Sequence, residues 1–199
     1  PSDNGSIYNI MQICEPLIIA DATGTGLEPG VAESWTVAPD GLSVDLKLRQ
    51  GIKFSTGTPV TVDDAIFSLQ KVSDPKASFG FAFDAVKSFE KVDDSTLRIT
   101  LKRPYAALQS ALCLFASSIV SKADYEKDPT AFGQKPVCTG PFEVQSYERG
   151  SQVVLVPNPN YWRMGEDGKP LPYLDKVILK YVPESNSRVL GLQSGDFDV

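Results

Sequence analysis

Hydrophobic residues follow two spacings along the chain, and each spacing predicts a different element. Residues 7–17 carry apolar side chains at helical intervals, which predicts an amphipathic helix. Every second residue from Leu42 to Leu48 is leucine or valine, and polar residues stand between them, as in a strand with one buried face. Asp40-Gly41 is a hairpin-turn signal just before this strand, so we predict an antiparallel partner at residues 31–37.

The same two patterns continue to the end of the chain. Thr61, followed by Asp63 and Asp64, is typical of a helix start, and the predicted helix ends before Asp74-Pro75. Further strands are predicted at residues 89–92, 96–102, 119–120, 142–147, 152–156 and 176–182, and further helices at residues 106–114, 123–127 and 187–193. Most of these strands are neighbours joined by short turns, which indicates an α+β fold rather than a doubly wound parallel sheet.

Charge and composition exclude several classes of function. The 25 acidic and 19 basic residues give a net charge of −6, and Lys and Arg form no run, so we expect no nucleic-acid partner. The chain has no histidine, which removes imidazole catalysis and the commonest metal ligand. A serine nucleophile would need a lysine base, and no S-x-x-K motif with a matching S-D-N segment is present. We therefore predict no catalytic residue, no metal site and no cofactor.

The three cysteines, Cys14, Cys113 and Cys138, leave their chemistry open. They show no C-x-x-C spacing and have no histidine partners, which argues against zinc. The pattern favours buried, small apolar residues, and an odd number of cysteines does not decide whether two of them pair.

Two long segments together resemble one protein family. The segment LEPGVAESWTVAPDGLSVDLKLRQGIKFSTGTPVTVDDAIFSL (residues 27–69) is similar to the signature region of the family 5 extracellular solute-binding proteins. These are the peptide, oligopeptide and nickel receptors of ABC importers. The second match is TGPFEVQSYERGSQVVLVPNPNYW (residues 139–162), followed by YLDKVILKYVPESNSRVLGLQSGDFDV. Cys138 departs from the pattern, because a Gly or a polar residue is common before Thr139-Gly140 in the family.

The resemblance implies a periplasmic-binding-protein-like fold of class II, present as a partial lobe. We expect a mixed sheet from residues 1–16 and 139–199, which correspond to part of the first subdomain of the N-terminal lobe. Residues 17–138 correspond to an inserted, hairpin-rich subdomain. The resemblance implies that the second lobe is not part of this sequence, so we expect a fragment with an open sheet edge at residues 176–182. In an oxidising compartment Cys14 would pair with Cys138, because both belong to the same subdomain.

The function implied by the resemblance is capture of a small solute, with a short peptide favoured. The receptor would lie in the periplasm or at the outer face of the membrane, and would deliver its ligand to ABC permease subunits. Two alternatives remain open: a ligand-sensing or interaction module on the same fold, and a receptor for a non-peptide solute such as an opine, a sugar or a nickel chelate. No motif in the sequence separates these ligands.

Candidate ligand contacts come from loops and helix starts. Asn4 and Gly5 precede the first helix on a stretch that lines the cleft in relatives, although an ordinary N-cap explains them equally well. Alternating phenylalanines at 79, 81 and 83 would bury one face of a strand, with one ring left for the cleft. The remaining candidates are Phe115 and Ser117 in a loop, and Thr139 at the return between subdomains. Tyr161 and Trp162 are interpreted as packing residues.

Overall fold

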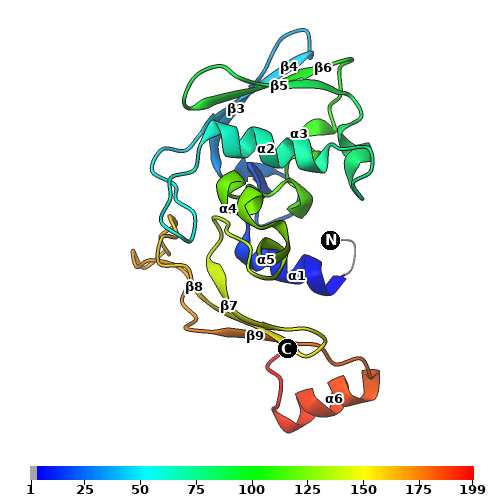
Figure 1. The fold of residues 1–199 in the computed structure, drawn as a ribbon, viewed down its shortest axis with the longest axis vertical. Helices are drawn as coiled ribbons and strands as arrows, with labels where there is room; N and C mark the ends of the chain where they lie inside the picture. The colour runs from blue at the N-terminus through cyan, green and yellow to red at the C-terminus, as the bar shows by residue number, and fades with distance from the viewer. Residues whose placement is uncertain (1–3) are drawn as a thin grey trace.

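The computed structural model describes residues 4–199, which form a short two-stranded sheet, β1-β2, and two larger sheets with helices between them (Figure 1). The larger sheet lies at one end of the molecule and has four antiparallel strands in the order β3-β4-β6-β5. Its strands are β3 (Ala32–Val37), β4 (Ser43–Leu48), β5 (Val86–Lys91) and β6 (Thr96–Leu101). The predicted hairpin between β3 and β4 is confirmed, with Val37 opposite Val44.

Alternation places the core on one face of this sheet. Val44, Leu46 and Leu48 are buried in β4, and β6 buries Leu97 and Ile99 next to them. Helix α2 (Val62–Val72) contacts β5 and β6 and closes the core (Figure 1). The helix begins directly after Thr61, where the sequence predicted its start.

The cap of α2 uses both members of a capping box. The Thr61 hydroxyl accepts a hydrogen bond from the Asp64 amide, and Asp64 accepts one from the Thr61 amide. Asp64 also accepts a hydrogen bond from the Lys122 amide at 3.0 Å, which fixes the start of α2 against the start of α4.

The region between the sheets differs from the sequence prediction in four places. The alternating phenylalanines do not form a strand, because Gly80 packs against the Asp74 carbonyl and the chain turns into a 3-10 helix. The helix predicted at 106–114 is only one turn long, and in place of the strand predicted at 119–120 Val120 forms an isolated bridge. An unpredicted helix follows residue 128. The elements are η1 (Gly80–Phe83), α3 (Leu108–Ala111), η2 (Phe115–Ser117), α4 (Lys122–Lys127) and α5 (Pro129–Gln134).

The second sheet has three strands in the order β7-β8-β9, and β9 is an edge strand as predicted. It consists of β7 (Phe142–Glu148), β8 (Gln152–Pro157) and β9 (Val177–Lys180). Every pairing between named strands in the described part of the chain is antiparallel, so the parallel pairing expected of a mixed sheet is not found there. The remaining elements are α1 (Asn4–Ile13), β1 (Ile18–Ala20), β2 (Leu27–Pro29) and α6 (Ser185–Ser194).

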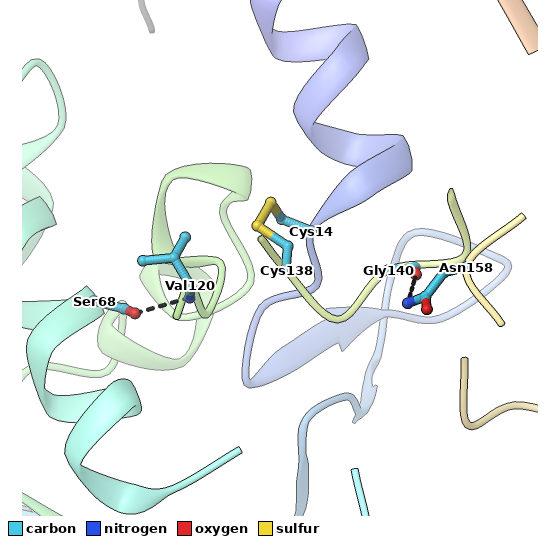
Figure 2. Close-up of a disulfide and its surroundings, with 6 residues drawn as sticks. All are labelled: Cys14, Ser68, Val120, Cys138, Gly140 and Asn158. Carbon is cyan, nitrogen blue, oxygen red and sulfur yellow. Dashed lines mark hydrogen bonds between the residues drawn. A yellow bond between two sulfur atoms is a disulfide. The ribbon is translucent and has the colours of Figure 1, made fainter. Parts of the chain in front are cut away.

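A disulfide joins the end of α1 to the segment that enters β7 (Figure 2). Cys14 and Cys138 pair with their Cα atoms 4.9 Å apart, which confirms the pairing predicted from the resemblance and corrects the interpretation of both as free apolar residues. Cys113 is free. The disulfide lies in a smaller hydrophobic cluster with Phe142 and Leu155, separate from the cluster around β4, β6 and α2.

Candidate functional site

A groove of about 460 Å³ lies where α1, η2, α5 and the β7-β8 hairpin meet. Ile10 and Ile13 come from α1, and Val144 and Val153 come from the paired strands. Phe115 in η2 completes the apolar part of the lining. The groove is therefore built from four elements that lie far apart in the sequence.

Backbone contacts around the disulfide hold these elements in place. Pro16 forms an isolated bridge with Ser118, so the chain leaving α1 pairs with the chain leaving η2. Val120 forms a second bridge with Cys138, and its amide donates to the Ser68 hydroxyl at 3.0 Å (Figure 2). A Cβ on Gly140 would collide with the Ile13 carbonyl, so glycine is needed for this close approach.

The lining has polar atoms but no charged side chain. Asn9 is a groove residue whose Nδ2 donates to the Gly5 carbonyl at 3.0 Å, while its buried Oδ1 has no partner. Ser118 also lines the groove; it is 7% exposed, and its Oγ has no partner either. Such unpaired polar groups are uncommon in protein interiors.

Two predicted site residues lie at this groove. Phe115 lines it, and Phe79 packs edge to face against Phe115 with ring centroids 5.0 Å apart. Gly5 is exposed and supplies the carbonyl that orients Asn9. Asn4 is the first residue of α1, and its side chain lies outside the described part of the structure.

The other predicted site residues do not line the groove. Phe81 is 73% exposed, while Phe83 is buried in the larger core. Ser117 is fully buried, and its hydroxyl donates to the Ala111 carbonyl at 2.7 Å. Thr139 is also fully buried, and its Oγ1 has no hydrogen-bond partner. Solvent reaches neither hydroxyl in this structure.

A buried carboxylate outside the groove was missed by the sequence analysis. Glu15 accepts hydrogen bonds from Tyr161 Oη at 2.9 Å and from Trp162 Nε1 at 2.8 Å. Arg163 lies 3.4 Å from the same carboxylate, and Arg49 and Arg163 both stack on the Trp162 ring. Burial raises the pKa of Glu15 despite these partners, and burial together with the Glu15 charge raises the pKa of Tyr161.

This cluster fastens the end of α1 to the turn after β8. Trp162 is partly buried against the larger core, in agreement with its interpretation as a packing residue. One signal for this cluster was available in the sequence: Glu15 is a carboxylate that directly follows an apolar helix. Within residues 4–199 no three His, Cys, Asp or Glu side chains gather as a metal site would require.

Comparison with known proteins identifies the family. The model of the bacterial extracellular solute-binding proteins, family 5 Middle, matches residues 26–199. The chain belongs to family 5 of the bacterial extracellular solute-binding proteins. Heme-binding protein A of Haemophilus influenzae is 33% identical to this family 5 chain over 98% of the chain and 39% of the relative. The glutathione-binding protein GsiB of Escherichia coli is 35% identical over 83% of the chain and 32% of the relative.

Solved structures agree with this assignment. The binding protein AgaA of Agrobacterium, in complex with agropinic acid, matches with a TM-score of 0.89 at 31% identity over 98% of this chain and 39% of that one. DppA of Helicobacter pylori, in complex with the peptide STSA, matches with a TM-score of 0.82 at 28% identity, covering 99% and 42% of the two chains. The fold is that of a periplasmic binding protein, present as part of a lobe, and the chain spans about two fifths of these proteins.

The matching family consists of extracellular solute-binding proteins, and the neighbour DppA is an ABC transporter-associated periplasmic binding protein. None of the helices described between residues 4 and 199 has the length and apolar character needed to cross a bilayer.

Proposed function

We propose that the family 5 protein captures a short peptide outside the cytoplasm and passes it to the permease subunits of an ABC importer. The groove at α1 forms one wall of its ligand site, and the protein performs no chemistry on the ligand. The observation that carries this proposal is the groove itself, an apolar and aromatic hollow of about 460 Å³ with unpaired hydrogen-bonding atoms. Small-molecule sites have this composition.

A peptide suits the groove because an extended peptide offers amide N–H donors at regular intervals. Asn9 Oδ1 can only accept a hydrogen bond, and no donor among the described residues reaches it. The relative DppA, which was solved with the peptide STSA, shares this fold. An opine is the second candidate, because AgaA, solved with agropinic acid, matches with the higher TM-score of 0.89.

Among the predicted contacts, we propose that Phe115 touches the ligand and that Phe79 holds its ring in place. Asn4, Gly5 and Phe81 are proposed to form the rim. Ser117 and Thr139, both buried, would support the wall from behind. We also propose that residues 17–138 form a subdomain inserted between residues 1–16 and 139–199.

A thermal-shift screen of the full-length protein against tripeptides, opines, sugars and nickel chelates tests the function, with calorimetry on each positive result. Phe115→Ala should weaken tripeptide binding about tenfold, equivalent to about 1.4 kcal/mol. Phe67→Ala is the matched control, because this ring packs on Tyr125 and lies outside the groove lining. Turnover of any bound solute would contradict the proposal, and so would a lack of saturable binding across the screen.

A further inference from the structure

We propose that the groove selects an uncharged aromatic or branched aliphatic group next to a hydrogen-bond donor, and that it excludes carboxylates and ammonium groups. This inference rests on the proposed function, because it takes the groove to be part of the ligand site. It adds a chemical class to that site: a ligand segment that is apolar, neutral and able to donate.

The first argument is the absence of charge over a large surface. In the whole chain 22% of residues are charged. Neither α1, η2 nor α5 contains an Asp, Glu, Lys or Arg, and no such residue within the described range 4–199 lines the groove. A ligand carboxylate or ammonium entering here would lose part of its hydration without gaining a counter-charge, which is unfavourable.

The second argument is the size and shape of the apolar part. Phe115, Phe132 and Tyr147 supply rings, and Ile10 and Ile13 supply branched side chains. Burying one aromatic ring of a ligand among them yields about 25 cal/mol for each Å² removed from water. A volume of about 460 Å³ is ample for one such side chain.

The third argument is the pair of unpaired polar atoms. Asn9 and Ser118 both line the groove, and Asn9 Oδ1 and Ser118 Oγ are buried atoms without a hydrogen-bond partner among the described residues. An unpaired buried polar atom destabilises the empty groove, and a ligand donor that reaches it restores the missing hydrogen bond. An amide N–H of the ligand can donate a hydrogen bond to Asn9 Oδ1. A carboxylate has no donor for this atom, so Asn9 Oδ1 favours the amide over the anion.

Three small probes with the same ring separate these chemistries. Benzamide is neutral and donates, benzoate is an anion, and benzylammonium is a cation. Titrated into the full-length protein with isotope-labelled isoleucine methyl groups, benzamide should move the Ile10 and Ile13 signals at about fivefold lower concentration than either charged probe, about 1 kcal/mol of discrimination. Equal or stronger binding of benzoate would overturn the proposal, as would the absence of any methyl shift with benzamide.

Variants test whether the groove itself sets this preference. Asn9→Asp places a carboxylate in the lining, so benzylammonium should bind about tenfold tighter and benzamide should bind more weakly. Gln145→Glu is the matched control, because it adds the same charge at an exposed position of β7 that does not line the groove. Ser118→Ala should weaken benzamide binding severalfold. If Gln145→Glu acts like Asn9→Asp, the effect is long-range and the proposal is wrong.

The fragment titrations and the solute screen test different claims, so either one can fail without the other. Selective benzamide binding with no solute found would contradict the transport function but keep the groove chemistry. Saturable tripeptide binding with unselective fragments would keep the function and reject the groove chemistry.

Discussion

Glu15 is a carboxylate that sits inside the molecule between a helix end and a distant turn. It is 7% exposed, and its partners Tyr161 and Trp162 follow it by more than a hundred residues. Burial favours the protonated form and raises the pKa of Glu15, whereas Arg49 and Arg163 favour the ionised form and limit the increase. The cluster therefore makes the contact between α1 and the turn after β8 sensitive to pH.

We predict that Glu15→Gln changes the pH dependence of unfolding. The folded pKa of Glu15 lies above its ordinary value of 4.5, so the folded state binds more protons than the unfolded state between these two pKa values. The Glu15 contribution to stability therefore falls as pH rises through that window and is constant above it. The stability difference between wild type and Glu15→Gln should grow in favour of wild type as pH falls toward 4.5.

Urea unfolding from pH 4.5 to 7 measures this difference. Several aspartates, such as Asp45 beside Arg98, have lowered pKa values and act in the opposite direction. They are present in both proteins, so their effects cancel in the comparison. Parallel curves for wild type and Glu15→Gln would show that Glu15 does not titrate differently on folding.

Which residues are predictable from sequence depends on how local their environment is. Val44 and Leu46 were predicted to be buried because alternation with polar neighbours is a local pattern. Phe81 alternates in the same way but is exposed, since a 3-10 helix replaces the strand. The burial of Glu15 depends on partners more than a hundred residues away, so no local pattern predicts it.

At the scale of elements, the start of α2 is held by Asp64 rather than by its neighbour Asp63. Asp64 accepts hydrogen bonds from the amides of Thr61 and Lys122, whereas Asp63 makes only an exposed contact with Lys91 at 3.4 Å. Asp64→Ala should cost about 2–3 kcal/mol because it leaves both amides without an acceptor. Asp63→Ala should cost less than about 1 kcal/mol. Denaturant titration measures both, and equal losses would mean that charge, not capping, stabilises this helix start.

The elements that the sequence predicted well are those with both a periodic core face and a clear boundary. Helix α2 and the β7-β8 hairpin meet both conditions. Helix α5 has the boundary alone: Asp128 caps it and Pro129 begins it, but none of its residues is buried, so periodicity gave no signal. Residues 119–120 are apolar but form no strand, because Val120 makes an isolated bridge with Cys138 and the Ile119 amide donates to the Glu15 carbonyl.

At the scale of the whole molecule, the disulfide connects positions separated by 124 residues. Reduction releases a loop of that length in the unfolded chain, so Cys14→Ala with Cys138→Ala should cost about 2–5 kcal/mol. Cys113→Ala, at the free cysteine, is the control and should cost less than either change at the bridge. Denaturation with and without reductant provides the measurement. Insensitivity of the wild-type midpoint to reductant would contradict this role.

The groove shows the limit of sequence reasoning at this scale. The predicted loop position placed Phe115 near the cleft, but the sequence gave no indication that Asn9 Oδ1 and Ser118 Oγ would lack hydrogen-bond partners. Those two residues line the same groove because Pro16 pairs with Ser118 and the disulfide fixes the end of α1. Their juxtaposition is a property of the tertiary structure.

The unpaired side of β9 leads to a prediction about self-association. One edge of β9 pairs with β8 and the other has no partner strand in the described residues, and Ile178 on it is 48% exposed. Nearby α6 adds exposed apolar side chains at Val189 and Leu190. Open apolar edges recruit further strands, so the 199-residue chain on its own should form dimers or larger species through β9.

Ile178→Lys should shift the 199-residue chain toward monomer, because a charged side chain blocks edge pairing. Val92→Lys is the matched control, since Val92 is 49% exposed on the other sheet's β5-β6 turn and should leave association unchanged. Sedimentation velocity over a hundredfold range of concentration, on the order of micromolar to the high micromolar range at which open edges associate, distinguishes the two variants. If the wild-type chain stays monomeric throughout, the exposed edge of β9 is protected by its own twist and side chains. If both lysine variants shift the chain toward monomer equally, the association depends on the net charge of the chain and not on the edge of β9.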